Sequence, residues 1–328
     1  MFSQQAVAHN ALHDVSDVLI IGQGPAGLSA ALALGRVRRN VVIFDSGEYR
    51  NQASSHAHTI PTHDHKNPAV IRQEMAAEIK AKYTTITFAG IAAQTVSEVD
   101  GAIFELKDAN GRLWKGKKVI LATGSCDVMP DISGYKELWG KRIFHCPFCH
   151  GFEETGAPNG ATLINADNAA EIMTAITFGH LARQFTPNIT ILTNGLAQLD
   201  TNEKIVAAKA HGLKVDSRPI SKLTPGDSGS SLTVEFVDGS RSTYSFIYHK
   251  PPTKIRGDFA QQLGLLMTPA GDIAIANMFQ QTSRRGVFAA GDCATMLKQV
   301  AVAIGAGVTA GAGVNVQILE DEFANGWW

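Results

Sequence analysis

The feature that most constrains the fold is an apolar run that leads directly into a glycine-rich turn. Asp17–Ile21 (DVLII) is typical of a buried parallel strand, and Gly22-Gln-Gly24-Pro-Ala-Gly27 follows at once. An Ala- and Leu-rich helical stretch then runs to about Gly35, before a second apolar run at Asn40–Phe44 (NVVIF). This order predicts a β-α-β unit of the Rossmann type, with the glycines at its first turn.

Asp45 stands at the end of the second predicted strand, 23 residues after Gly22. An acid about 20 residues beyond the first glycine holds an adenosine ribose in dinucleotide-binding proteins. The turn suits a pyrophosphate, because a helix N-terminus presents free N–H groups and the positive end of its dipole. Glycines alone are weak evidence, but strand, helix and acid together predict a nucleotide site.

Two later segments repeat the pattern of strand and glycine. Lys117–Leu121 (KKVIL) leads into Ala122-Thr123-Gly124, and Gly286–Ala290 leads into Gly291-Asp292. With 328 residues, the chain has room for about two domains. We therefore predict an α/β protein with two Rossmann-like domains, the second inserted in the first. The predicted segments are 1–126 (nucleotide-binding domain, first part), 127–249 (central domain) and 250–328 (nucleotide-binding domain, second part).

The predicted central domain resembles a second Rossmann unit without the glycine fingerprint. Its expected elements are strands at 161–164 and 188–192 and a helix at 171–183. Asn165, Asp167 and Ala170 stand where the glycines would fall. Asp167 would place a carboxylate where a pyrophosphate approaches, and like charges repel. We predict a dinucleotide fold that holds no dinucleotide; the alternative is that this unusual loop still binds a nicotinamide nucleotide.

The segment that carries chemistry is a cysteine pair, Cys146 and Cys149, spaced as C-x-x-C. Such a pair can close a small disulfide ring, and we expect it at the start of a helix whose dipole lowers the pKa of the nearer thiol. His145 and His150 flank the pair, and Glu153 follows. These side chains can move protons near neutral pH, so the pattern predicts redox catalysis.

Three other interpretations of the cysteine pair remain open. A structural zinc site would need two more ligands, but Cys126 and Cys293 are single and far apart. C-x-x-C-H is also the attachment pattern of c-type haem, which belongs outside the cytosol. The third interpretation is two buried, inert cysteines.

Charge and hydropathy narrow the function further. Twenty-nine Lys+Arg against thirty Asp+Glu leave a net charge of −1, so we expect no nucleic-acid partner. Gln299–Leu319 is uncharged and contains Gly307-x-x-x-Gly311, a spacing that suits paired membrane helices, but we predict a buried helix and no membrane. Met1–Asp17 shows no secretory pattern, and we expect a cytoplasmic protein.

The ordered motifs resemble those of the low-molecular-weight thioredoxin reductases. Gly22-x-Gly24-x-x-Gly27, Ala122-Thr123-Gly124, the C-x-x-C followed by His-Gly-Phe, and Gly291-Asp292 cover nearly the whole chain. Within that superfamily the sequence is similar to the fungal dithiol oxidases of the gliotoxin and holomycin type. It departs from the reductases in having His150 after the second cysteine and no central glycine fingerprint or run of arginines.

The resemblance implies FAD as the cofactor. FAD would lie across the three glycines, with Asp45 on its ribose, Asp292 on its ribityl chain, and Gln299 and Val300 at the flavin edge. The resemblance also implies cofactor contacts for the remaining candidates in these motifs and in the loop that follows Asp45. These residues are Pro25, Ala26, Ser46, Arg50, Asn51, His58, Ala122, Thr123, Gly124 and Gly291.

The resemblance also implies a reaction. A small-molecule dithiol would reduce the Cys146–Cys149 disulfide through a mixed disulfide at Cys146, with His150 and His145 as candidate bases. Cys149 would pass the electron pair to flavin, and molecular oxygen would become hydrogen peroxide. The family further implies a homodimer. The alternatives are an NADPH-dependent reductase of thioredoxin or a small disulfide, and a non-catalytic flavoprotein.

Four histidines, His56, His58, His63 and His65, follow the predicted ribose acid. Their H-x-H spacing could bind a metal ion. The resemblance instead places this loop in the FAD domain beside the flavin, so we predict cofactor and substrate contacts and no metal.

Overall fold

The computed structural model describes residues 15–227 and 229–326. Most of the N-terminal segment 1–17, for which no secretory pattern was predicted, lies outside these residues. The chain forms two compact units, which are described separately. The first contains residues 1–50, 69–126 and 254–328, and the second contains residues 51–68 and 127–253. The second unit is inserted in the first, as predicted, and its end lies four residues beyond the expected 249. Residues 51–68 correct the prediction, because this histidine-rich loop packs with the inserted unit.

The first unit is built on a seven-stranded sheet in the order β3-β2-β1-β6-β5-β4, with β17 also paired to β6. Five strands, β3, β2, β1, β6 and β17, pair in parallel, while the β4–β5 hairpin adds antiparallel to the first half of β6. The strands are β1 (Val15–Ile21), β2 (Val41–Phe44), β3 (Ile86–Phe88), β4 (Ala93–Val99), β5 (Ile103–Asp108), β6 (Leu113–Leu121) and β17 (Val287–Ala289). The helices are α1 (Pro25–Arg36), α2 (Pro68–Lys82), α6 (Phe259–Gln262) and α7 (Val300–Ala324).

The central strands of this sheet are buried on both faces. Alternate residues of β1 belong to opposite cores: Ile20 packs in a cluster with Leu34 and Val314, and Leu19 packs in a cluster with Phe104. This two-sided burial explains why β1 and β6 end in apolar runs, at 18–21 and 119–121. Because β1 is buried up to Ile21, the glycine turn begins at the next residue, Gly22.

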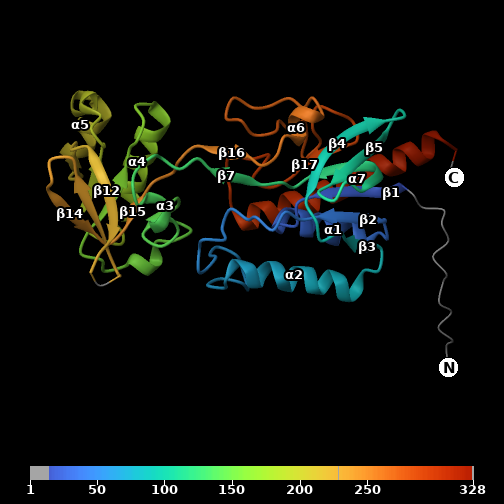
Figure 1. The fold of residues 1–328 in the computed structure, drawn as a ribbon, viewed down its shortest axis with the longest axis horizontal. Coiled ribbons are helices and arrows are strands. Elements are labelled where there is room, and N and C mark those ends of the chain that lie inside the picture. Colours follow the sequence, from blue (N-terminus) through green and yellow to red (C-terminus); the bar gives the residue numbers. More distant parts are fainter. Residues whose placement is uncertain (1–14, 228, 327–328) are drawn as a thin grey trace. The chain divides into compact units, whose positions relative to one another are not determined.

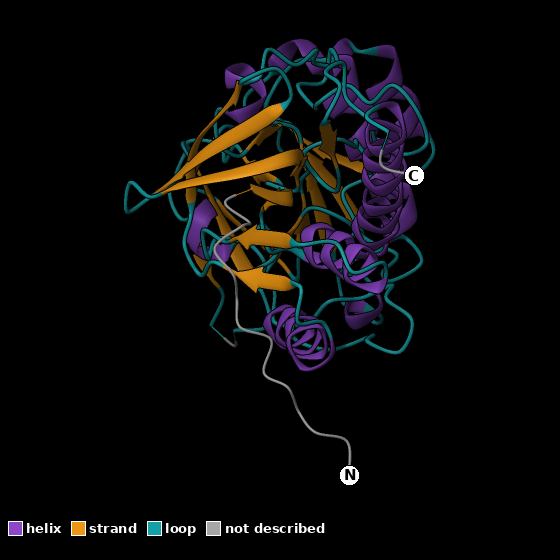
Figure 2. Cartoon of the chain, turned by 90° about the vertical axis from the view of Figure 1, so that its right-hand side faces the viewer, coloured by secondary structure: helices purple, strands orange, loops and turns teal. Residues whose placement is uncertain are grey.

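Helix α7 packs against α1 through its small residues. By length and composition alone α7 could cross a membrane. A Cβ on Gly307 would lie 2.1 Å from the Ala26 carbonyl oxygen, and a Cβ on Gly311 would lie 2.9 Å from the Ala33 Cβ. The glycine spacing therefore serves close helix packing within the first unit, and Figure 2 shows this long helix beside the strands.

The second unit contains a five-stranded parallel sheet in the order β11-β10-β9-β15-β8 and a three-stranded antiparallel sheet in the order β12-β13-β14. The parallel strands are β8 (Ile143–Phe144), β9 (Gly160–Leu163), β10 (Ile189–Leu192), β11 (Lys214–Asp216) and β15 (Ile247–Tyr248). The antiparallel strands are β12 (Ile220–Pro225), β13 (Leu232–Phe236) and β14 (Arg241–Tyr244). The helices are α3 (Tyr135–Leu138), α4 (Ala169–Ala182) and α5 (Glu203–Ala210), with 3₁₀ turns η1 (Phe152–Glu154) and η2 (Ala197–Thr201).

Besides the two ends of residues 51–68, the chain passes between the units at 126–127 and at 253–254, and these last two crossings pair with each other. β7 (Ser125–Asp127) and β16 (Thr253–Ile255) form a two-stranded sheet, which Figure 1 shows as adjacent strands. The Pro-Pro sequence at 251–252 directly precedes the second crossing.

Candidate active site

The glycine turn of the first unit is shaped by close backbone contacts on two sides. Gly22 adopts φ +114°, and a Cβ there would lie 2.2 Å from the Ala122 carbonyl oxygen. A Cβ on Gly27 would lie 1.9 Å from the Gly22 carbonyl oxygen. Both positions therefore require glycine. The contact with Ala122 also shows how the Ala122-Thr123-Gly124 segment supports the turn.

The N-terminus of α1 remains open above this turn. Gly24 is its N-cap, makes no side-chain capping bond, and has nothing within 4 Å of the position of a Cβ. Pro25 begins the helix, and the first turn contains no acidic residue. A helix N-terminus with open space and no competing carboxylate fits a pyrophosphate, so the turn fits the dinucleotide part of FAD.

Asp45 and Asp292 both have partners within the first unit. Asp45 accepts hydrogen bonds from the Tyr49 hydroxyl at 2.5 Å and from the Gly47 N–H at 3.1 Å. The Asp292 carboxylate lies 3.5 Å from Arg50 Nη1. These contacts hold both carboxylates in place beside the glycine-containing turns, and their roles toward a cofactor stay predictions.

The start of α7 is fixed by a buried cation. Lys298 Nζ lies 2.8 Å from Asp272 Oδ1 and donates to the carbonyl oxygens of Asp292 and Thr295. Gln299 is the helix N-cap, and Val300 is the first helical residue. The Lys298 contacts thus tie the Gly291-Asp292 turn to the helix end where the flavin edge is predicted. Predicted cofactor contacts that no described contact tests remain for Ser46, Ala26, Thr123, Gly124 and Gly291.

Cys146 and Cys149 lie in the turn that follows β8, which corrects the expectation of a helix start. The N–H groups of Cys149 and His150 both donate to the Cys146 carbonyl oxygen at 3.1 Å, and only the short η1 follows. A macrodipole is therefore not what activates the thiol, because a three-residue 3₁₀ turn has almost none. Both cysteines are half-buried.

Local hydrogen bonds activate Cys146 in place of a helix. The Cys149 thiol, the backbone N–H groups of Cys149 and Phe148, and the charge of Lys250 lower the pKa of Cys146 to about 7, although burial opposes this. The Cys149 N–H lies 3.2 Å from the Cys146 Sγ. The pKa of Cys146 is thus lowered by local donors and a nearby charge, and not by a helix dipole.

His150 is held on three sides. Its ring stacks on Phe144 with centroids 3.8 Å apart, and its carbonyl oxygen accepts the Tyr248 hydroxyl at 2.7 Å. Its Nε2 lies 3.5 Å from the buried Glu154 carboxylate, which Arg142 also approaches at 3.3 Å. His145 instead lies with its ring 6.0 Å from that of Trp139. His150 is therefore a candidate base whose ring and backbone are both held by described partners.

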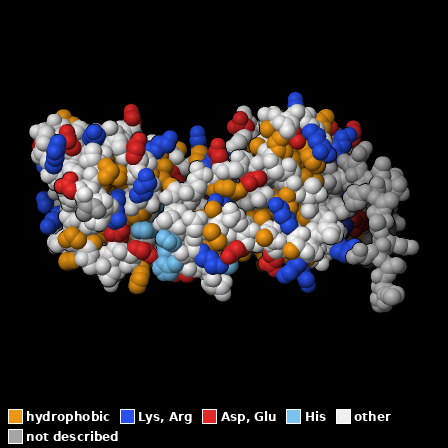
Figure 3. Space-filling model, turned by 60° about the horizontal axis from the view of Figure 1, so that its bottom comes forward, with side chains coloured by type: hydrophobic (Ala, Val, Ile, Leu, Met, Phe, Trp, Pro, Cys, Tyr) orange, Lys and Arg blue, Asp and Glu red, His pale blue; other side chains and the backbone are white. Residues whose placement is uncertain are grey.

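A cavity of about 570 Å³ lies beside this turn within the second unit. One side comes from the histidine-rich loop, including His58 and His65, and the other from the segment after the cysteines. Phe148 and Phe152 line it, with 65% and 77% of their surfaces exposed. Figure 3 shows histidine side chains gathered in one patch on this face. The cavity offers apolar contact area to a small molecule near the thiols.

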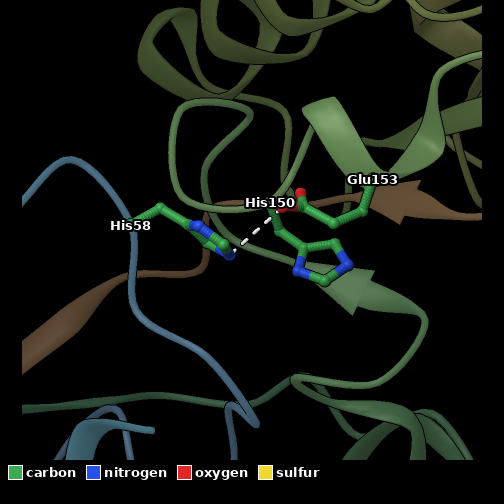
Figure 4. Close-up of side chains that lie close together, drawn as sticks. All are labelled: His58, His150 and Glu153. Atoms are coloured by element: carbon green, nitrogen blue, oxygen red, sulfur yellow. Dashed lines mark ion pairs between the residues drawn. The ribbon is translucent and has the colours of Figure 1, made fainter. Parts of the chain in front are cut away.

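His58 contacts the C-x-x-C segment. Its Nε2 lies 3.3 Å from Glu153 Oε1, and its ring lies 6.4 Å from that of His150. Figure 4 shows the His58 ring pointing toward Glu153 and His150. Burial is the main cause that lowers the pKa of His58, against the attraction of Glu153. The predicted cofactor contact of His58 stays a prediction, whereas its partners within the second unit were not foreseen.

The turn after β9 holds a carboxylate, but not the one the sequence indicated. Glu171 Oε2 accepts from the Asn165 N–H at 2.9 Å and from the Ala166 N–H, and its N–H donates to Asn168, the N-cap of α4. Asp167, by contrast, is exposed and accepts from Gln198. Sequence analysis missed Glu171, although the Asn168-x-x-Glu171 spacing is that of a capping box.

Glu171 is itself fixed by buried partners. Its second carboxylate oxygen lies 3.4 Å from His249 Nε2, and His249 Nδ1 lies 2.7 Å from the Tyr135 hydroxyl. Burial opposes ionisation, but the bonds from His249 and the two amides outweigh it and hold the pKa of Glu171 below its usual range. The loop amides next to α4 thus face a permanent anion supplied by the chain.

Comparisons with known proteins agree with this architecture. Residues 16–307 match the model of the pyridine nucleotide-disulphide oxidoreductase family. The chain is 46% identical to the thioredoxin reductase sirT of Leptosphaeria maculans, over 94% of this chain and 96% of that protein. It is 40% identical to the thioredoxin reductase tcpT of Claviceps purpurea, with coverage of 94% and 96%.

Solved structures show the same fold. An oxidoreductase from Agrobacterium tumefaciens superposes with a TM-score of 0.82 at 32% identity, covering 93% of this chain and 99% of that one. The crystal structure of HlmI gives a TM-score of 0.85 at 28% identity, covering 95% of both chains. These matches confirm the predicted thioredoxin-reductase architecture.

Proposed function

This chain belongs to the pyridine nucleotide-disulphide oxidoreductase family, and from that premise we propose that it is an FAD-dependent dithiol oxidase. Family and relatives make it a thiol-disulfide oxidoreductase and imply a flavin. We propose further that it closes a disulfide in a small-molecule dithiol and that molecular oxygen is the final electron acceptor. The proposal depends on one observation: the Glu171 carboxylate already accepts hydrogen bonds from the loop amides to which a nucleotide would bind in the second unit.

The electrons of a reductase would enter through a pyridine nucleotide bound to that loop. A pyrophosphate would have to displace Glu171 from the Asn165 and Ala166 amides, or share them with a fixed negative charge. Either outcome is unfavourable, since a buried carboxylate deprived of its partners is costly. Electrons entering through sulfur need no such displacement.

The substrate step is a pair of thiol–disulfide exchanges. One substrate thiolate attacks the Cys146 sulfur of the Cys146–Cys149 disulfide, forming a mixed disulfide and releasing Cys149 as a thiolate that takes up a proton. The second substrate thiolate then attacks the first substrate sulfur, which is bonded to Cys146 in the mixed disulfide. This closes the substrate disulfide and releases the Cys146 thiolate. The substrate loses two electrons and two protons, and the cysteine pair gains the two electrons. The low pKa of Cys146 favours the second exchange, because a more acidic thiol leaves faster.

His150 is the proposed acceptor of the substrate thiol's proton. Phe144 and the Tyr248 hydroxyl hold its ring and backbone in place, and Glu154 lies where it stabilises an imidazolium. A bound flavin would supply reoxidation of the Cys146–Cys149 dithiol and delivery of the electron pair to oxygen, giving hydrogen peroxide.

Anaerobic mixing tests the proposal. A small dithiol, dithiothreitol first, should bleach the flavin absorbance of the wild-type protein and fail to do so in the Cys146→Ser variant. NADPH at micromolar concentration should leave the flavin oxidised. Rapid bleaching by NADPH would overturn the proposal.

The second candidate is an NADPH-dependent disulfide reductase, favoured by the names of sirT and tcpT. It requires nucleotide at the β9–α4 turn and NADPH consumption with a disulfide substrate. A homodimer is proposed by family analogy only, and sedimentation of the holoprotein tests it.

A further inference from the structure

His58, His150 and Glu153 form a cluster beside the C-x-x-C turn. Of the three, only His150 has a role in the proposed reaction. One ligand atom from each residue lies within 4.8 Å of the other two. Figure 4 shows the three side chains converging, although His58 comes from the histidine-rich loop and the other two follow β8. All three residues belong to the second unit. Two imidazoles and one carboxylate form a donor set that zinc uses in open sites.

A second observation at His58 points to a missing ligand. Its side chain is only 8% exposed, and among the described residues its Nε2 has no hydrogen-bond partner. A buried nitrogen without a hydrogen bond is costly, because it has lost its water, and its ion pair with Glu153 forms only when His58 is protonated. That same nitrogen is the atom that faces Glu153, at 3.3 Å.

The spacing suits a tetrahedral ion. With bonds of about 2.0–2.1 Å, two ligand atoms on one zinc ion are separated by roughly 3.4 Å, close to the distance from His58 Nε2 to Glu153 Oε1. The Glu153 side chain is 29% exposed and has room to turn toward an ion.

The far side of His58 resembles the support given to metal-bound histidines. Asp64 Oδ1 lies 3.8 Å from His58 Nδ1 and is itself held by the Thr59 N–H at 2.8 Å. At 3.8 Å this carboxylate is too far to accept a hydrogen bond, but its charge favours a proton on the second ring nitrogen, which leaves Nε2 to face a metal. The alternative cluster of His58 with Asp64 and His65 is weaker, because the last two side chains are more than half exposed.

We infer that His58, His150 and Glu153 form a binding site for a divalent ion of the zinc class, with the fourth position open. Such an ion occupies His150 and blocks proton uptake there, so it inhibits dithiol turnover. This inhibitory consequence rests on the proposed function, whereas the binding itself does not.

Zinc binding is measured on the flavin-loaded Cys146→Ser/Cys149→Ser protein, because thiolates also bind zinc and must be removed first. In thiol-free buffer, competition with a chromophoric chelator should show one zinc ion per chain. Adding His58→Ala or Glu153→Gln should weaken binding at least tenfold. His56→Ala is the matched control, since this exposed neighbour of the same loop should leave affinity unchanged.

Two results would overturn the inference: no saturable zinc binding in the double cysteine variant, or equal affinity in the His58→Ala and His56→Ala proteins. Far-UV circular dichroism and flavin content verify folding, and His58→Asn is the second variant if His58→Ala does not fold. Because the dithiol and the active-site thiolates also bind zinc, the inhibition is read as a difference: zinc should slow dithiol-driven flavin bleaching more in the wild-type protein than in His58→Ala, each compared with its own zinc-free rate. Failure of the dithiol to bleach flavin at all contradicts the proposed function and leaves the zinc-binding result intact.

Discussion

The β1–α1 turn and the β9–α4 turn occupy the same topological position in two Rossmann-like units. In the first, Gly24 leaves the helix N-terminus open, and no acidic residue stands in the first helical turn. In the second, Asn168 caps the helix and the Glu171 carboxylate binds the amides of Asn165 and Ala166. The same backbone frame therefore offers an anion site in one unit and satisfies it internally in the other.

The two units also differ in the environment of their cysteines. Cys293 is fully buried in the first unit, where burial raises the pKa of its thiol. Cys146 is half-buried in a turn of the second unit, where local donors lower the pKa of its thiol to about 7. One unit thus has an open helix N-terminus, and the other fills the corresponding turn with Glu171 and contains the C-x-x-C.

The largest effect is expected from Gly22→Ala, which would force the β1–α1 turn away from Ala122. The new Cβ would lie 2.2 Å from a backbone oxygen at φ +114°, so we expect a cost of about 4 kcal/mol or more and at least a tenfold loss of bound flavin. Flavin absorbance per chain measures this. Gly90→Ala, at φ +65° with nothing within 4 Å, is the matched control and should retain its flavin. Full flavin content in Gly22→Ala would contradict the assigned cradle.

The next largest effect separates the two thiols. In the reduced protein, Cys146 should be alkylated by iodoacetamide about a hundredfold faster than Cys293 at pH 7, because about half of Cys146 is thiolate and Cys293 is buried. Peptide mass spectrometry over time measures both rates.

The Cys146 rate should rise with pH to half its maximum near pH 7. Lys250→Ala should move this midpoint upward, since it removes a positive charge that favours the thiolate. Equal rates for the two cysteines would remove the contrast between the units.

The smallest effect concerns the filled turn. Glu171→Gln should lower the free energy of unfolding by about 1–3 kcal/mol at pH 7, because it removes a charged acceptor from two amides and His249. Denaturant unfolding measures this, with the exposed Glu203→Gln as control.

The pH dependence follows from the lowered pKa of Glu171. Its folded pKa lies below the unfolded value of about 4.3, so its stabilisation is fully present above that value and is lost as the pH falls through the folded pKa. The difference between wild type and Glu171→Gln should therefore shrink at about pH 3.5. An unchanged difference at both pH values would show that Glu171 acts through shape and not charge.

Local sequence was sufficient for the features that depend on neighbours along the chain. Gly22, Gly24 and Gly27 predicted the β1–α1 turn, because a turn between strand and helix is set by the backbone freedom of its own residues. The insertion of one unit in another followed from the repeated strand–glycine patterns. The C-x-x-C gave the reactive pair but the wrong local structure, since one short turn and a helix start share the same residue types.

What the sequence by itself determined is the architecture and the chemical type of the cysteine pair, because apolar periodicity and short spacings are local properties. Only the tertiary structure decided which carboxylate fills the β9–α4 turn and which groups surround the thiols. Glu171 meets His249 across 78 residues, and His58 meets Glu153 from a loop nearly a hundred residues earlier. Contacts at such separations arise from chain packing, and no spacing along the sequence encodes them.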